Sequence, residues 1–350
     1  MTRTDFSTRI IAWQKRHGRH DLPWQNTRDP YRIWLSEIML QQTQVATVIP
    51  YYTRFLEKFA TLRDLATASE DEVLALWSGL GYYSRGRNLL RAAQIVAEKF
   101  RGEFPKAMDD ILALPGIGQS TAAAISAFAF GERQAILDGN VKRVFARHFG
   151  VAGFPGDKNV ETKLWNVANE VLPKNKIEGY TQGLMDLGAT VCLRARPLCL
   201  ACPVENTCVA KREGCIQELP SPRPKKAVPE KSTTMLIITH AGEVLLEKRP
   251  PTGVWAGMWC FPELGNGEIP REVCHERFAL ETKSSKPWDV LQHGFTHFKL
   301  RITPQPVFVQ KQLLRASEPG VMWLSIGDAL AAAIPKPVRM LLTKLRDEKI

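Results

Sequence analysis

Four closely spaced cysteines could hold a metal. They form the pattern C-x6-C-x2-C-x5-C, at Cys192, Cys199, Cys202 and Cys208. Loops of this length allow four thiolates to surround one soft metal centre. Zinc and iron–sulfur clusters both take four cysteines, so residue type alone does not choose between them. Among the remaining cysteines, Cys215 is an alternative ligand, whereas Cys260 and Cys274 are expected to pack in a core.

Two carboxyl groups have contrasting sequence surroundings. Asp138 stands in the segment LDGNV, just before an expected helix, where the common role of an aspartate is to cap the helix N-terminus. Glu37 lies inside the apolar stretch 34–40, and burial there would raise its pKa by disfavouring the charged form. A raised pKa is what a general acid needs near neutral pH. The alternative is that helix geometry turns Glu37 to solvent.

A glycine-rich turn between two expected helices could bind phosphate. The segment LPGIGQSTA, residues 114–122, is typical of a helix end, a turn and a second helix start. Gly116 and Gly118 leave no side chain over the turn, so backbone N–H groups can meet a phosphate oxygen. Such contacts carry no information about base sequence. An ordinary helix–helix turn is the alternative.

Together these features resemble a known enzyme family. The cysteine pattern, the glycine-rich turn and an aspartate twenty residues after Gly118 are similar to those of the endonuclease III-like DNA glycosylases, whose turn is a helix-hairpin-helix. Glu37, the run LQQTQ at 40–44 and Ser120 further resemble the A/G-specific adenine DNA glycosylases of the MutY type, over nearly the whole chain. Those enzymes work in base-excision repair. They hydrolyse adenine from duplex DNA where it is mispaired with 8-oxoguanine or guanine, which prevents G:C to T:A mutation.

The resemblance implies a monofunctional mechanism with two carboxyl groups. Adenine is a poor leaving group as an anion, so Glu37 is expected to protonate its N7 while the glycosidic bond stretches. Asp138, left ionised, would stabilise the oxocarbenium charge on the sugar by its field or through a transient covalent bond. Relatives that also cut the strand carry a lysine nucleophile where this chain has Ser120, and serine has no amine for a Schiff base. We therefore expect no strong lyase activity and no metal at the catalytic centre.

Further roles follow from the same resemblance, because the base must leave the stack before it reacts. The residues implied to wedge into the duplex are Gln42, Leu80 and Tyr82. Those implied to line or support the adenine pocket are Trp24, Ser120 and Asn140. The glycines of the turn, Gly116 and Gly118, are implied to bind phosphate. The alternative for Tyr82 is a place in the core.

The resemblance also implies one [4Fe–4S] cluster, rather than zinc, on the four cysteines. In the family this cluster orders a basic loop beside the DNA and does no chemistry. The positive side chains of that loop would here be Arg194, Arg196, Lys211 and Arg212.

A second domain resembles the Nudix fold of nucleotide hydrolases. Phe295, Thr296 and His297 match the Phe-Ser/Thr-His loop with which the family recognises 8-oxoguanine, and the last two can offer hydrogen bonds to the damaged base. The Nudix metal box is poorly matched, because one register puts His275 where a metal-binding Glu belongs and Phe278 where a Gly belongs. The sequence therefore predicts recognition without nucleotide hydrolysis.

The helices and strands expected around these residues predict an α+β protein. A length of 350 residues suggests roughly two domains. Residues 1–216 are expected to form an all-α catalytic domain, because apolar residues repeat at three and four positions and glycine and proline mark turns between short helices. Residues 217–231 hold four prolines and four basic residues, which is typical of an extended linker. Residues 232–350 are expected to mix α and β, with strand-like runs at 235–238, 243–247 and 295–302 and a C-terminal helix.

The net charge and the distribution of apolar residues limit which partners and which cellular location are expected. Forty-seven basic against 36 acidic residues give a net charge of +11 and a pI near 9.4, which favours a polyanion such as nucleic acid. We expect double-stranded DNA as the partner and, by analogy, a monomer. No run of about 18 apolar residues occurs, and the first residues lack the apolar core of a secretory signal. A cytoplasmic chain is therefore expected, associated with the nucleoid if its source is bacterial.

Two other functions stay open. An endonuclease III-type pyrimidine glycosylase with lyase activity is disfavoured by Ser120 and by the second domain, although Lys142 could trap an aldehyde weakly. A non-catalytic iron–sulfur module that binds DNA would need the cysteines and the turn. It would have no use for Glu37 together with Asp138.

Overall fold

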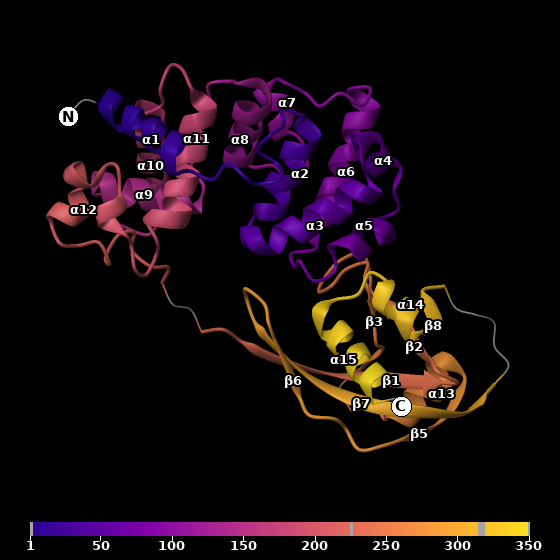
Figure 1. Cartoon of the computed structure of the whole chain (residues 1–350). Helices are drawn as coiled ribbons and strands as arrows, with labels where there is room; N and C mark the ends of the chain where they lie inside the picture. Colours follow the sequence, from indigo (N-terminus) through magenta and orange to yellow (C-terminus); the bar gives the residue numbers. More distant parts are fainter. Residues whose placement is uncertain (1–2, 225–226, 266, 314–318, 349–350) are drawn as a thin grey trace. The chain divides into compact units, whose positions relative to one another are not determined.

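Two units share the chain, and both are discontinuous in sequence. The computed structural model describes residues 3–224, 227–265, 267–313 and 319–348 (Figure 1). The first unit joins Met1–Ala66 with Arg91–Lys225, and the second joins Thr67–Leu90 with Lys226–Ile350. The helical stretch 67–90 thus belongs with the C-terminal unit, and the first strand begins at Glu230, inside the expected linker. The domains expected from the sequence, 1–216 and 232–350, are each one continuous segment, and 67–90 lies in the first of them. These domain boundaries stay a prediction.

The first unit is built of helices with short connections. In chain order they are α1 (Arg3–His17), α2 (Pro30–Leu40), α3 (Val45–Lys58), α4 (Leu62–Thr67), α7 (Met108–Leu112), α8 (Gln119–Phe130), α9 (Gly139–Phe149), α10 (Lys158–Glu170), α11 (Ile177–Asp186) and α12 (Val209–Arg212), while α6 (Ser84–Lys99) begins in the second unit and ends in the first. A π-helical turn, Leu187–Val191, continues α11. The expected helical architecture is confirmed. In the part of the chain that the structure describes, no helix combines the length and the apolar character needed to cross a membrane.

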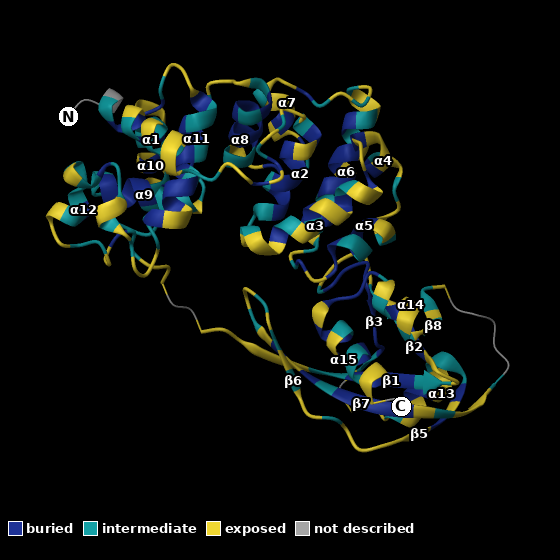
Figure 2. Ribbon diagram, in the orientation of Figure 1, coloured by how far each residue is buried: buried dark blue, intermediate teal, exposed yellow. Residues whose placement is uncertain are grey.

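The core of this unit gathers around α9 and α11. Apolar residues of α9 recur at three- and four-residue spacing, so Val141, Val144 and Phe145 are all buried on one side of the helix. They belong to the same core cluster as Tyr180 of α11. Figure 2 shows α8 buried over much of its length. This packing holds the N-terminal end of α9, where Asp138 stands, in a fixed place.

A mixed sheet with helices on both faces makes up most of the second unit. Its strands are β1 (Glu230–His240), β2 (Glu243–Lys248), β3 (Trp259–Cys260), β4 (Glu263–Leu264), β5 (Leu280–Ser284), β6 (Leu291–Gly294), β7 (Lys299–Gln312) and β8 (Val321–Ser325), and its helices include α5 (Glu70–Trp77), α13 (Pro270–Phe278), α14 (Ile326–Ala331) and α15 (Lys336–Asp347). The strand order β3-β2-β1-β7-β5 pairs β1 with β7 in parallel and with β2 in antiparallel orientation. On β1, Met235 and Ile237 join the core under α15, whereas Leu236 and Ile238 join the core under α13. The expected mixture of α and β is confirmed.

One expected strand is shorter than its pattern suggested. Alternation over 295–302 predicted a continuous strand, but residues 295–298 form the turn between β6 and β7. The two phenylalanines explain the error, because Phe295 and Phe298 stack with ring centroids 4.4 Å apart and a 2.8 Å backbone hydrogen bond from Phe295 N–H to Phe298 O closes the turn. Thr296 and His297 are therefore exposed at the tip of a hairpin.

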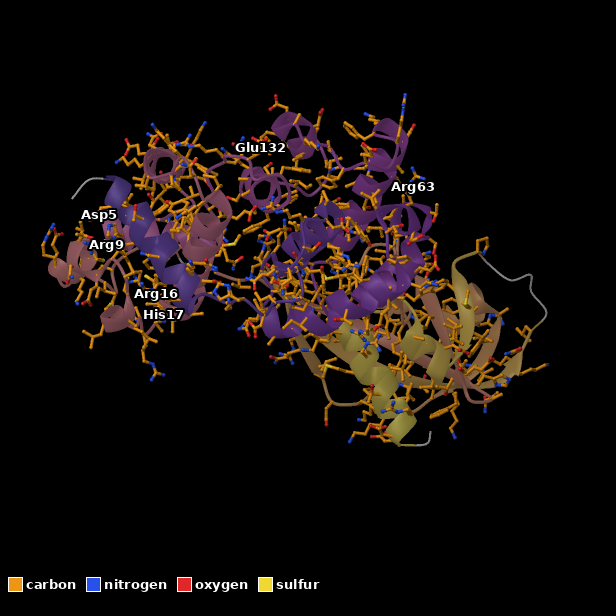
Figure 3. All side chains as sticks on the ribbon, turned by 45° about the horizontal axis from the view of Figure 1, so that its top comes forward. Asp5, Arg9, Arg16, His17, Arg63 and Glu132 are labelled. Carbon is orange, nitrogen blue, oxygen red and sulfur yellow. The ribbon has the colours of Figure 1, made fainter. Side chains whose placement is uncertain are left out.

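One buried ion pair matters more to the first unit than its surface pairs. Figure 3 labels Asp5 and Arg9, which form a 3.1 Å pair along α1, and exposed pairs of this kind contribute little. The side chain of Asp186, in contrast, is fully buried and accepts hydrogen bonds from Arg19 Nε at 2.7 Å and from Gln182 Nε2 at 2.9 Å. A buried carboxylate is stable only when its oxygens are bonded in this way. The pair therefore fastens the segment after α1 to the end of α11.

Removal of the Asp186 carboxylate should destabilise the first unit strongly. Asp186→Ala leaves the partly buried Arg19 guanidinium without its anion, and breaking such a pair costs about 3 kcal/mol. We expect the free energy of unfolding, measured by urea denaturation, to fall by this amount. The control Asp110→Ala removes an exposed carboxylate of α7 and should change stability by no more than about 0.5 kcal/mol. Equal losses in the two variants would contradict the importance of the pair.

Candidate active site and cysteine loop

A cavity in the first unit collects most of the residues predicted to act on a base. Its volume is about 1510 Å³, and α2, α8, α9 and α11 contribute to its wall. The wall contains Trp24, Glu37, Gln42, Ser120, Asp138 and Asn140. The fold thus brings the two candidate acids, which are far apart in sequence, to the same cavity.

Glu37 lies in the cavity wall, on α2. Asp29 caps this helix by accepting a 2.9 Å hydrogen bond from Tyr31 N–H, and Pro30 occupies the first helical position. Burial first, and then the negative charge of Asp138, raise the pKa of Glu37 to about 8. Glu37 is only partly exposed and is not turned to bulk solvent. At neutral pH it is therefore a protonated carboxylic acid that faces a cavity.

Asp138 caps α9, as its place before a helix predicted. Its Oδ1 accepts a 2.7 Å hydrogen bond from Val141 N–H. Burial raises the pKa of Asp138 above its ordinary value, although the N–H groups of Val141 and Asn140 and the charge of Arg143 oppose this rise. The N-terminus of a helix also stabilises an anion. Because the charge of Asp138 helps to raise the pKa of Glu37, Asp138 ionises before Glu37, and Glu37 keeps its proton up to about pH 8.

Ser120 supports the segment that carries Asp138. It stands in the first turn of α8, and its hydroxyl oxygen accepts a 3.1 Å hydrogen bond from Leu137 N–H. The hydroxyl thus ties the helix after the glycine-rich turn to the residue next to Asp138. A serine at this place offers a hydrogen-bonding group but no amine.

The glycine-rich turn has a backbone shape that leaves it open to a ligand. Gly116 has a φ of 82°, which favours glycine, and a Cβ placed on Gly118 would meet open space. Gln41 Nε2 donates to Gly116 O and to Thr121 Oγ1, both at 3.3 Å. The next residue, Gln42, is exposed with a φ of 58°. Gln41 therefore fixes the position from which Gln42 extends.

Two arginines of α9 hold the cysteine loop. Buried Arg147 donates from Nη1 to Leu193 O at 2.7 Å and from Nη2 to Arg194 O at 2.9 Å. Arg143 Nε donates to Cys192 O at 2.8 Å, and Arg143 Nη2 donates to Asn140 Oδ1 at 2.9 Å. The helix that Asp138 caps therefore also fixes the start of the cysteine loop.

The four cysteines are partly buried and close enough to interact electrostatically. Burial first, and also the charges of the other three cysteines, raise the pKa of Cys202 to about 12. Burial likewise raises the pKa of Cys208. Across the described residues, no three His, Cys, Asp or Glu side chains meet as ligands of one metal ion. The [4Fe–4S] cluster on the four cysteines therefore stays a prediction.

Two of the four basic side chains predicted for this loop form ion pairs with nearby glutamates. Arg194 and Arg196 are exposed. Lys211 forms an ion pair with Glu205 at 2.5 Å, and Arg212 forms one with Glu213 at 3.1 Å. The positive surface of the loop therefore depends mainly on its first two arginines.

The remaining predicted residues belong to the second unit. Tyr82 has a φ of 49° and is 46% exposed, so the alternative of a core residue is wrong. Leu80 is only 6% exposed and would have to move to enter a duplex. Phe295 packs edge-on against His293, with centroids 4.7 Å apart, beneath exposed Thr296 and His297.

Sequence reasoning missed several polar residues of the cavity wall. Arg19, Arg143 and Gln182 all line the cavity. Gln182 and Asp186 are four residues apart on α11 and hydrogen-bonded, which is ordinary helix spacing and marks no function. Only the fold brings these residues to the cavity, so no local pattern could have found them.

Comparisons with known proteins identify relatives of both units. A model of the HhH-GPD superfamily of base excision DNA repair proteins matches residues 35–170, and a NUDIX domain model matches residues 233–344. The chain is 35% identical over 348 residues to an adenine DNA glycosylase of Buchnera aphidicola subsp. Acyrthosiphon pisum, and the match covers 99% of both chains. It is 32% identical to the adenine DNA glycosylase of Homo sapiens, over 95% of this chain and 72% of the human one. A solved structure of a thermostable thymine-DNA glycosylase is similar over 60% of this chain and 97% of its own, with a TM-score of 0.54 and 30% identity.

The raised pKa of Glu37 predicts how stability depends on pH. The folded protein keeps this proton up to about pH 8, whereas the unfolded chain releases it near the ordinary value of 4.5. Between these values the unfolded state binds fewer protons, so the free energy of unfolding falls as pH rises, by at most about 1.4 kcal/mol per pH unit from this group. Above pH 8 this contribution stays constant.

Glu37→Gln has no such proton to lose and serves as the reference. Urea denaturation across this pH range should show the variant gaining stability relative to the original chain as pH rises. A difference that does not change with pH would contradict the raised pKa.

Proposed function

The chain belongs to the family of adenine DNA glycosylases of base excision repair, and from this premise we propose that it removes adenine mispaired with 8-oxoguanine or guanine in duplex DNA. The observation that carries the proposal is the shared cavity of Glu37 and Asp138. There one carboxyl group keeps its proton at neutral pH and the other gives its proton up first. Hydrolysis of an N-glycosidic bond needs a proton donor and an anion side by side.

Glu37 is the general acid of this proposal. It donates its proton to N7 of the flipped adenine, so that the base leaves as a neutral molecule. Its pKa of about 8 keeps it protonated at neutral pH and close to the value at which proton transfer is efficient. After the transfer, the Glu37 carboxylate can orient the water that completes hydrolysis.

Asp138 stabilises the positive charge that develops on the sugar. The hydrogen bond from Val141 N–H fixes its orientation, and the end of α9 favours its charged form. Ser120 and Asn140 keep the surrounding segment in place through their bonds to Leu137 N–H and Arg143. Trp24, 8% exposed in the cavity wall, offers an aromatic surface to the base.

The same groups support a monofunctional enzyme. Ser120 has no amine that could form a Schiff base with the sugar. The nearby amine, Lys142, forms a 2.6 Å ion pair with Glu161. We therefore propose that strand cleavage by a lyase step is weak at most.

Contacts with the DNA come from four places in this proposal. The open turn at Gly116 and Gly118 binds backbone phosphate, and the exposed arginines of the cysteine loop add positive charge. Gln42 and Tyr82, both exposed at positive φ, wedge into the duplex, whereas Leu80, which is buried, would enter it only after moving outward.

The four cysteines would hold one [4Fe–4S] cluster. Burial and the charges of the neighbouring cysteines raise the pKa of Cys202, so this thiol needs a positive metal centre before it can be a thiolate, and four soft ligands suit an iron–sulfur cluster. A cluster spreads its ligands over several irons and does not require them around one ion. It would keep the loop folded beside the DNA and take no part in the chemistry of the base.

The second unit would recognise 8-oxoguanine without hydrolysing nucleotides. Thr296 and His297 at the hairpin tip are free to meet a base, and Phe295 holds the turn by ring packing. On α13, where a Nudix enzyme concentrates its metal-binding carboxylates, this chain has Glu272 and Glu276 with His275 between them. Magnesium prefers oxygen ligands, so an imidazole where that motif has a metal-binding carboxylate weakens a magnesium site.

Single-turnover assays on three duplexes test the proposal. We expect base loss from adenine opposite 8-oxoguanine and opposite guanine, with strand breaks mainly after alkali, and no release of thymine glycol. Glu37→Gln and Asp138→Asn should each lower the rate about 10²–10⁴-fold while DNA binding survives, because each removes a group used in the transition state.

The matched controls are Glu57→Gln and Asp110→Asn, which make the same changes at exposed positions and should keep the full rate. Full activity of either cavity variant would remove that residue from the mechanism. Cleavage of the thymine glycol duplex would favour the endonuclease III-type alternative.

A further inference from the structure

The loop that carries Tyr82 is anchored to the sheet-bearing part of its own unit. We call residues 79–82, between α5 and α6, the wedge loop. Ser78, the last residue before it, is 8% exposed and donates its hydroxyl to Ile334 O at 2.6 Å. Arg339 of α15 donates from Nη2 to Ser78 Oγ at 2.9 Å and from Nη1 to Leu330 O at 2.8 Å. One small hydroxyl therefore joins the end of α5 to α15 and to the segment before it.

Two further contacts reinforce this anchor on either side of the wedge loop. Arg87 Nη1 donates to Ala256 O at 2.6 Å, and Lys248 Nζ pairs with Asp71 at 2.8 Å. Leu74 of α5 is fully buried in the core cluster of the sheet. The residues before and after the wedge loop thus both pack on the same body.

That core also carries the hairpin tip proposed to recognise 8-oxoguanine. Phe295 and Phe298 pack against the cluster that contains Leu74, and so does Tyr83, the neighbour of Tyr82. Trp255, a buried member of the cluster, lies 5.5 Å from Phe295, ring centroid to centroid. The hairpin tip and the wedge loop are therefore both mounted on one core.

The wedge loop is itself stiff. Trp77 Nε1 and Arg85 Nη2 both donate to Gly81 O, at 3.2 and 3.1 Å. The Arg85 guanidinium also lies 5.4 Å from the ring centroid of Tyr82. A displacement of α5 would therefore move Tyr82 as well, because these contacts keep the loop from changing its shape.

We propose that Ser78 and Arg339 are positioning residues for base excision, which lock the wedge loop to the hairpin tip so that recognition of 8-oxoguanine sets where Tyr82 enters the duplex. This inference rests on the proposed roles of Tyr82 and of the hairpin tip. Neither Ser78 nor Arg339 touches the substrate, and both act through Tyr82. Their removal should therefore matter only while Tyr82 is present.

A double-mutant cycle on the full-length chain tests this dependence. Ser78→Ala should slow single-turnover excision of adenine opposite 8-oxoguanine about three- to tenfold, with a smaller loss opposite guanine, because one buried hydrogen-bond junction is broken. In a Tyr82→Ala background the same change should cost less than about twofold. Ser78→Thr, which keeps the hydroxyl, should restore most of the rate.

Controls separate this role from general destabilisation. Ser325→Ala removes the hydroxyl that caps α14 in the same unit, through the 3.1 Å bond from Asp328 N–H, and should lower the melting temperature without changing the rate. If Ser78→Ala does not fold, Arg339→Gln enters the same cycle.

Three outcomes would overturn the inference. If Ser78→Ala and Tyr82→Ala slow excision independently, so that their effects multiply, the anchor does not act through Tyr82. An unchanged rate for Ser78→Ala rejects the positioning role directly. A full rate for Tyr82→Ala alone contradicts the proposed wedge as well, which distinguishes failure of the proposed function from failure of the anchor.

Discussion

Placing two negative charges in one buried cavity costs free energy. The surroundings that the first unit gives to Glu37 and Asp138 determine which of the two carboxyl groups is charged. Burial raises the pKa of both groups, but Asp138 also has the helix end and the N–H of Val141 to stabilise its charged form. The causes that act on Glu37 are burial and the charge of Asp138, and both favour the proton. In the proposed mechanism, this asymmetry between the two sites decides which group donates a proton and which remains an anion.

Helix α9 connects this asymmetry to the cysteine loop. Its first turn holds the Asp138 carboxylate, and one and two turns later Arg143 and Arg147 bind carbonyl groups at the start of the loop. The buried residues of the same helix form part of the core. Helix α9 therefore contributes to the core, positions Asp138 and holds the start of the cysteine loop. This explains why the cysteines, which touch no reacting atom in the proposal, still matter to the geometry of the site.

Much of this arrangement could be predicted from the sequence, because it depends on local patterns. The helical spacing, the glycine-rich turn and the aspartate before α9 all act within a few residues, and the family resemblance marked Glu37. The contacts of Ser78 with Ile334 and Arg339 join distant segments, so no local pattern assigned 67–90 to the second unit. The stacking of Phe295 on Phe298 likewise replaced the strand that alternation predicted. Gln182 reaches the cavity only through the packing of α11.

Infrared difference spectroscopy tests the protonation of Glu37 most directly. The spectrum of the chain minus that of Glu37→Gln, followed as pH is raised, isolates the carbonyl stretch of this one protonated carboxyl group. The account predicts that the band is present at neutral pH and disappears with a midpoint near pH 8. A band already lost near the ordinary value of 4.5 would show that Glu37 is ionised at neutral pH and would contradict the central claim.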